Sequence, residues 1–207
     1  MIRRLAQNVV GHIRENLLMC IVILFFFVAG IISGSYTIAK LSEEQLIKLS
    51  YFLSSFFALI KDQTPDILNV LLQSLANNFK LIASVAFCGL TVFFLPVMLI
   101  LIGIKGFMIG FTVSALVMQF GFAGILVSLI CILPPNIVIV FAYLRLGVDS
   151  SLNGIMNHRR KRLRGNTQRL SGGYMKQVLK ISLFCMLGVI IESVMTPFVL
   201  RLFAGIM

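Results

Sequence analysis

The sequence has few charged residues and very few acidic ones. Charged residues make up 12% of the 207 residues, and 7 Asp or Glu stand against 18 Lys or Arg. Apolar residues make up 59% of the chain, above the ~45–50% that is usual in soluble domains. A soluble globule of this size could not cover so much apolar surface, and a disordered chain would be polar. The composition excludes both classes and indicates an integral membrane protein.

Residues that carry out chemistry are also scarce. The four Cys residues stand singly in apolar stretches with no CxxC pair, which predicts neither a zinc site nor a disulfide framework. His12 and His158 lie in basic segments, and Glu43 and Glu44 point about 100° apart on a predicted helix. No P-loop, HExxH or GxSxG motif occurs. We therefore expect no enzymatic activity, no catalytic residue, no metal and no cofactor.

Long uncharged runs are present instead. The run 17–38 has 22 residues without a charge, enough to cross a hydrocarbon core of ~30 Å. A cleaved signal peptide is the alternative, because the start is basic, but signal cores have only ~7–15 apolar residues. The 39 uncharged residues of 106–144 suit two short spans that turn near Gln119–Gly124, or a re-entrant pair of half-helices.

The runs predict an all-α, multi-pass helical membrane protein with about five spans. It would form a single membrane domain over 1–207. The predicted boundaries are an interfacial amphipathic helix at 2–15, span 1 at 17–38, two extracytoplasmic amphipathic helices at 42–79, span 2 at 81–104, span 3 at 106–120, span 4 at 122–144, a basic cytoplasmic loop at 145–180 and span 5 at 181–203. We also expect the Pro134-Pro135-Asn136 sequence to break a helix.

The distribution of charge sets the orientation of these spans. Nine basic residues and one acid, Asp149, lie in 145–180, whereas acids and bases balance around 42–79. Because Lys and Arg mark cytoplasmic loops, this places 145–180 inside and 42–79 outside. Contact of Arg159–Arg162 with anionic lipid is favoured over contact with nucleic acid, and we expect no nucleic-acid partner.

The segment 42–79 has the pattern of two amphipathic helices. Ser42 with Gln45 forms a capping-box signature, and Thr64-Pro65-Asp66 predicts the start of a second helix. We expect both helices to lie on the outer surface, against lipid, each other or a partner. The candidate docking residues are Tyr51, Phe52, Phe56 and Leu71.

Glu192 is the one acid in the middle of a predicted span. A charge at that depth costs at least ~2.5–3.5 kcal/mol, so we expect the carboxyl to be protonated or paired. An interhelical hydrogen bond that locks the bundle, to Asn136, Thr112 or Gln119, is favoured over a coupling or substrate site of a transporter.

Small-residue pairs predict close helix packing. Gly30 and Gly34 are spaced as GxxxG, as are Gly106 and Gly110, and such pairs let backbones approach closely. They suit packing within the chain or contact between copies in a homo-oligomer. Lys105, at the predicted end of span 2, is interpreted as reaching to the inner interface.

The order of several short motifs resembles the stage II sporulation protein M family over about residues 5 to 203. The motifs are Asn77-Asn78, Gly89, Pro96, Lys105-Gly106-Phe107-x-x-Gly110-Phe111, Leu133-Pro134-x-Asn136-Ile137 and Glu192-x-x-x-x-Pro197.

The resemblance implies a multi-pass protein of endospore-forming bacteria, in the sporulation septum and later the engulfing mother-cell membrane. It implies a scaffold that anchors and recruits stage II sporulation proteins D and P, which cut peptidoglycan during septal thinning and engulfment. It also implies a fold similar to the membrane domains of type-2 ABC exporters. The alternative function is therefore a membrane subunit of an ABC-2-like transporter, with a cytoplasmic ATPase bound at 145–180.

Overall fold

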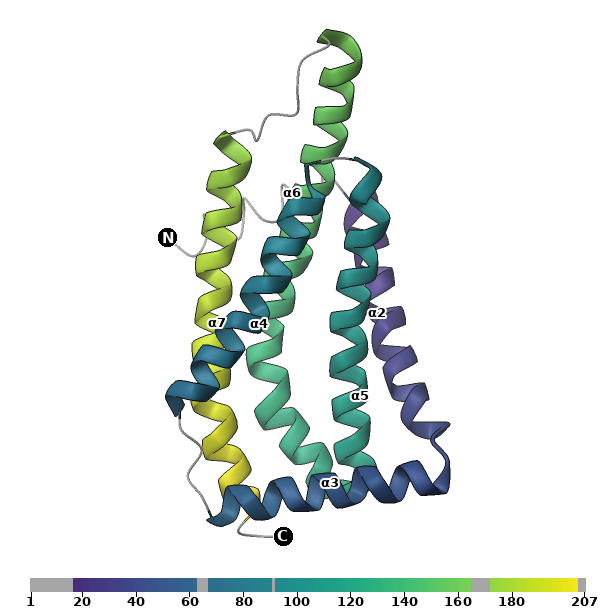
Figure 1. The fold of residues 1–207 in the computed structure, drawn as a ribbon, viewed down its shortest axis with the longest axis vertical. Coiled ribbons are helices and arrows are strands. Elements are labelled where there is room, and N and C mark those ends of the chain that lie inside the picture. The colour runs from purple at the N-terminus through teal and green to yellow at the C-terminus, as the bar shows by residue number, and fades with distance from the viewer. Residues whose placement is uncertain (1–16, 63–66, 91, 165–171, 205–207) are drawn as a thin grey trace.

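The computed structural model describes residues 17–62, 67–90, 92–164 and 172–204, and every regular element in them is a helix (Figure 1). In chain order the elements are α2 (Leu17–Ala39), α3 (Glu43–Asp62), α4 (Ile67–Cys88), the 3-10 turn η1 (Val92–Phe94), α5 (Leu95–Val127), the π-helical η2 (Ser128–Ile132), α6 (Leu133–Arg164) and α7 (Gly172–Ala204). The all-α prediction is confirmed for these residues. The interfacial helix predicted at 2–15 lies outside them.

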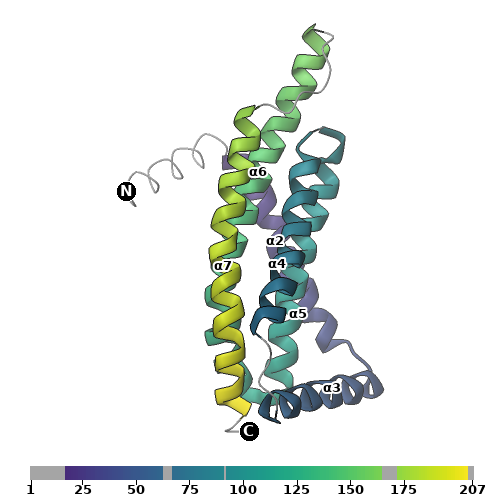
Figure 2. The ribbon, with the colours of Figure 1, turned by 60° about the vertical axis from the view of Figure 1, so that its left-hand side comes forward.

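Five helical segments run along the long axis of the molecule, and one lies across its end. α2, α4, α5, α6 and α7 stand side by side, while α3 crosses the lower end of the bundle (Figure 1). A second view shows the same arrangement, with α6 extending beyond the other helices at the upper end (Figure 2). The fold thus separates α3 from the end of α6 by the length of the bundle.

Local signals in the sequence account for several helix starts. At α3, the Ser42 N–H donates to Gln45 Oε1 over 3.0 Å, and the Gln45 N–H donates to Ser42 Oγ over 3.4 Å. This reciprocal pair is the predicted capping box. Pro96 lies in the first turn of α5, where its missing N–H costs no helical hydrogen bond.

The predicted boundaries of spans 2 and 3 are wrong. We expected spans at 81–104 and 106–120 that meet at Lys105, but α4 already ends at Cys88 and α5 is helical through Lys105. Gly89 and Leu90 are in turn geometry instead, and Pro96 lies at the start of the new helix. One cation inside a helix does not end it, so Lys105 does not mark a boundary.

α5 and α6 form a helical hairpin that the 106–144 run predicts. Gly121, with φ of 54°, is the one described residue in positive-φ geometry, and it lies within the predicted turn. After the turn, the backbone of Gly124 lies directly against the carbonyl group of Leu116. The leg 95–120 would be roughly 39 Å long at ~1.5 Å per residue, which exceeds the ~30 Å hydrocarbon core. This leg is therefore long enough to cross a membrane, which favours two full spans over a re-entrant pair.

We expect the Pro134-Pro135-Asn136 sequence to break a helix, but no break occurs there. The π-helical turn η2 precedes Pro134 and Pro135, and helical geometry continues into α6. A π turn widens the backbone just where a proline ring would otherwise meet the preceding carbonyl groups. The basic segment 145–180 is also largely helical, because α6 runs to Arg164 and α7 begins at Gly172. The prediction of a loop over 145–180 is therefore wrong for the described residues of this segment.

Two clusters of buried apolar side chains hold the bundle. The larger joins α2, α4, α5, α6 and α7 through residues such as Ile23, Val85, Ile102, Leu146 and Val189. The smaller joins α3 to the lower ends of α5 and α7 through Phe57, Leu116, Val127, Cys131 and Val199. Large apolar side chains also cover the outer surface of the helices, which suits a lipid environment.

Among the described residues, three helical stretches are long and apolar enough to cross a membrane. They are Leu17–Ala39, Val92–Arg159 and Gly173–Thr196, and the second, of 68 residues, contains the hairpin turn at Gly121. α4 is not among them because of its polar residues.

Candidate functional site

The GxxxG glycines lie in one seam between α2 and α5. A Cβ added at any of them would overlap a carbonyl oxygen of the facing helix: Gly103 for Gly30, Phe107 for Gly34, Phe27 for Gly106 and Ile31 for Gly110. Ser35 adds a hydrogen bond from its Oγ to the Gly110 carbonyl oxygen over 3.3 Å. The structure thus brings the two glycine pairs together within one chain.

α3 is attached to the bundle by a few residues and exposes most of its surface. Phe57 is buried, and its ring meets that of Phe120 edge-on with centroids 4.8 Å apart. On other faces of the helix, Tyr51 is 76% exposed, Phe52 64% and Phe56 42%. We call the exposed residues Tyr51, Phe52 and Phe56 the α3 surface.

Leu71 does not belong to this surface. It lies on α4, is half-buried and packs against the larger core cluster. We expected α4 to lie on the outer surface with α3, but α4 packs on α7 and α6 as part of the bundle. Of its polar side chains, Asn78 is buried and hydrogen-bonded inside the bundle. The docking candidates are therefore the residues of the α3 surface.

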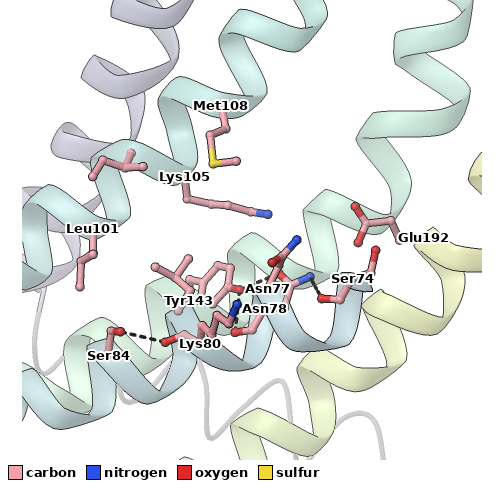
Figure 3. A pocket seen from close by; sticks show the side chains of 12 residues that line it. Ser74, Asn77, Asn78, Lys80, Ser84, Leu101, Lys105, Met108, Tyr143 and Glu192 are labelled. Carbon is pink, nitrogen blue, oxygen red and sulfur yellow. Dashed lines mark hydrogen bonds between the residues drawn. The ribbon is translucent and has the colours of Figure 1, made fainter. Parts of the chain in front are cut away.

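A cavity of about 490 Å³ lies between α4, α5, α6 and α7 (Figure 3). Most of its polar lining comes from α4. The polar side chains are Ser74, Asn77, Asn78, Lys80 and Ser84 of α4, Lys105 of α5, Tyr143 of α6 and Glu192 of α7. We call it the α4–α7 cavity.

A buried hydrogen-bond network forms one wall of the α4–α7 cavity. Tyr143 is 2% exposed, and its hydroxyl donates to Asn78 Oδ1 over 2.6 Å. Asn78 Nδ2 in turn donates to the Ser74 carbonyl oxygen over 2.9 Å. Lys105 Nζ lies 5.9 Å from the centre of the Tyr143 ring, where the face of the ring attracts a cation. Hydrogen bonds thus join the polar groups of this wall, and Lys105 lies beside it at the cavity.

Glu192 and Lys105 point toward one another across the α4–α7 cavity (Figure 3). Glu192 Oε2 is buried and has no hydrogen-bond partner. The arrangement places a cation and a carboxylate on opposite walls, with no direct ion pair between these two described residues. Lys105 thus lies within α5 and points into the cavity, and not at the end of a helix as predicted.

The three residues predicted to lock Glu192 bond elsewhere. Asn136 Nδ2 donates to the Ile132 carbonyl oxygen over 2.9 Å, and Thr112 Oγ1 donates to the Met108 carbonyl oxygen over 2.8 Å. Gln119 Nε2 lies 3.5 Å from Ser54 Oγ on α3. None of them supplies the predicted hydrogen bond. One signal in the sequence could have identified the residue that faces Glu192. Lys105 is a single cation within an apolar stretch, just as Glu192 is a single acid within another.

The family of this chain follows from its similarity to known proteins. The family model described as stage II sporulation protein M matches residues 23–197, a range that includes α3 and the α4–α7 cavity. Comparisons with curated proteins and with solved structures found no match. The match covers most of the chain and confirms the resemblance in the sequence: the chain belongs to the stage II sporulation protein M family, and is a sporulation-related membrane protein.

Proposed function

We propose that this protein is a non-enzymatic membrane scaffold that anchors and recruits peptidoglycan-degrading enzymes during septal thinning and engulfment in endospore formation. Its family links it to sporulation. The observation that carries the proposal is the α3 surface, a set of exposed aromatic residues on a helix across one end of the bundle. The partners would be stage II sporulation proteins D and P.

The proposal includes a topology with five crossings. These are α2, α4, the legs 95–120 and 122–159 of the hairpin, and α7. The basic end of α6, with His158 and Arg159 exposed, would lie in the cytoplasm because Lys and Arg favour that side. α3 lies at the opposite end of the bundle and would then face the cell wall. Anionic lipid would contact the basic end of α6.

The α3 surface has the features of a protein-docking helix. Aromatic residues dominate the energetics of many interfaces, because they bury a large area with few rotatable bonds. Tyr51 and Phe52 share their side of α3 with Glu44 and Lys48, which form an ion pair on the helix. A partner could bury the aromatic rings and meet the charged pair at the rim.

Site-specific photo-crosslinking in sporulating cells tests this assignment. A photo-reactive residue would replace Tyr51 in the full-length protein, and a second version would carry it at His158 on the opposite end. Capture of wall hydrolases from position 51 but not 158 supports the scaffold. Capture of an ATPase from position 158, with only lipid from position 51, would instead support the ABC-2-like transporter.

A matched pair of variants separates docking from folding. Phe52→Asp places a charge on the α3 surface, whereas Ser54→Asp places one at an exposed polar position of the same helix. We expect Phe52→Asp to reduce hydrolase capture roughly tenfold, the effect of one hot-spot residue. Ser54→Asp should leave capture unchanged. Normal capture by a stably inserted Phe52→Asp variant would contradict docking at α3.

A further inference from the structure

The α4–α7 cavity contains an unbalanced set of charges. Lys105 and Lys80 supply two cations, and Glu192 supplies one carboxylate. Glu192 Oε2 is buried without a hydrogen-bond donor. A buried carboxylate without a partner is costly, and we expect Glu192 to be protonated or paired. Because Glu192 lines the cavity, a cation that brings its own N–H groups would supply that pairing. The opposite wall, with Lys105, is suited to an anion.

The volume of the cavity, and the separation of Lys105 from Glu192 across it, suit a ligand that bridges the two residues. A cavity of about 490 Å³ is far larger than a single water, which occupies ~30 Å³, and falls within the ~300–1,000 Å³ of small-molecule sites. Lys105 and Glu192 point toward one another without a direct ion pair (Figure 3). One ligand with an anionic and a cationic end would satisfy both walls.

The two sides of the cavity mouth differ in polarity. On α4, the exposed residues Asn77, Lys80 and Ser84 form a polar side, which Gln73 extends by one further helical turn. On α5, Ile104 is 48% exposed and Met108 59%, in line with Ile100 at 56%. These three apolar residues recur every four positions and therefore share one face of α5. A polar head group could follow α4 into the cavity while an acyl chain lies along α5.

We propose that the α4–α7 cavity binds the head group of an amphiphile that carries a phosphate and a primary ammonium, as the head group of phosphatidylethanolamine does. The phosphate contacts Lys105, with Lys80 at the rim, and the ammonium donates to Glu192. The acyl chains lie against the exposed apolar face of α5. This site is separate from the α3 surface and does not depend on hydrolase recruitment.

Native mass spectrometry of the full-length protein in detergent tests the proposal. The protein would be mixed with equal amounts of phosphatidylethanolamine, phosphatidylcholine and phosphatidylglycerol. A quaternary ammonium has no N–H to donate to Glu192, and a glycerol head group has no cation. We expect retention of phosphatidylethanolamine to exceed that of either competitor roughly tenfold. Equal retention of the three lipids would overturn the proposal.

Two cavity variants assign the two ends of the ligand. Glu192→Gln should abolish the preference for phosphatidylethanolamine over phosphatidylcholine, because it removes the charge that selects the ammonium. Lys105→Gln should weaken retention of both lipids alike, because both carry the phosphate. The matched controls Glu44→Gln and Lys48→Gln lie on exposed parts of α3 and should change neither result. A retained preference in Glu192→Gln would overturn the assignment.

Two further measurements apply if a variant is unstable or if the ligand is a soluble molecule. If Glu192→Gln fails to fold, Asn77→Leu keeps both charges and fills the polar side of the mouth, and it should reduce retention of phosphatidylethanolamine. Free O-phosphoethanolamine carries the same head group without acyl chains. Its failure to compete would support a lipid source, whereas binding tighter than the lipid would overturn that source and retain the head-group chemistry.

Discussion

Single glycines set the distance between α2 and α5. A Cβ at Gly106 would overlap the carbonyl oxygen of Phe27, whereas a Cβ at Gly103 would lie 3.5 Å from the carbonyl oxygen of Phe26, an ordinary contact. Alanine favours a helix over glycine by ~1 kcal/mol, but overpacking costs ~1–3 kcal/mol. We predict that Gly106→Ala lowers the free energy of unfolding by about 1 kcal/mol, while Gly103→Ala leaves it unchanged or raises it.

Thermal unfolding of the purified protein in one detergent measures this difference. The two substitutions add the same methyl group to the same helix, three residues apart, so changes in helix propensity cancel between them. A Tm that shifts in the same direction and by the same amount in both variants would contradict the packing of α2 against α5.

Residue-level reasoning from the sequence succeeds where spacing alone sets a contact. GxxxG pairs place two small residues on one helix face, and the structure brings both pairs into one seam. The neighbour of Glu192 could not be found in this way. Its depth in a span predicts a polar environment, but which helix supplies the facing group depends on packing between elements distant in sequence. Lys105 became that neighbour only because α5 continues through it.

At the scale of elements, side chains of α6 and α7 donate hydrogen bonds to carbonyl groups at the C-terminal end of α4. Asn153 Nδ2 donates to the Gly89 carbonyl oxygen over 2.8 Å, and the Tyr174 hydroxyl donates to the Ala86 carbonyl oxygen over 2.8 Å. The last carbonyl groups of a helix have no partner within it, so these bonds satisfy them. They also fix the turn that leads into α5.

We predict that Asn153→Leu loosens this turn. The substitution keeps the approximate size of the side chain but leaves the Gly89 carbonyl group without its donor, at a cost of ~1–3 kcal/mol. Hydrogen exchange of the amides around 86–94 should become roughly tenfold faster or more. Met156→Leu, at a 50% exposed position of the same helix, should not change it. Unchanged exchange in Asn153→Leu would show that other contacts hold the turn.

Element boundaries were the least predictable part of the fold. The capping box at Ser42 can be predicted from the sequence because its two partners, Ser42 and Gln45, lie within four residues of each other. The turn after Cys88 was not, because the donors that stabilise it come from α6 and α7. The double proline likewise predicts a break only if the backbone before it is regular, and η2 shows that a π turn accommodates it.

The whole molecule places two chemically different surfaces at opposite ends of the bundle. α3 with its exposed aromatic residues lies across one end, and the basic end of α6 extends beyond the other (Figure 1). Composition indicates a membrane protein, and the charge pattern predicts that these two ends lie on different sides, but neither could show that polar α4 belongs to the bundle. α4 belongs to the bundle because its apolar side chains Ile82, Val85 and Cys88 join the larger core cluster, while several of its polar side chains line the α4–α7 cavity.

This separation predicts the outcome of cysteine labelling in spheroplasts. The native cysteines Cys20, Cys88, Cys131 and Cys185 are buried or half-buried, so their labelling should be low. A membrane-impermeant maleimide should label Tyr51→Cys in intact spheroplasts, because α3 would face outward. It should label His158→Cys only after permeabilisation, because basic segments favour the cytoplasm. Three proposed crossings, an odd number, separate the two sites: α4 and the two legs of the hairpin. Labelling of both sites from the same side would therefore exclude the proposed topology and, with it, a scaffold that meets wall enzymes through α3.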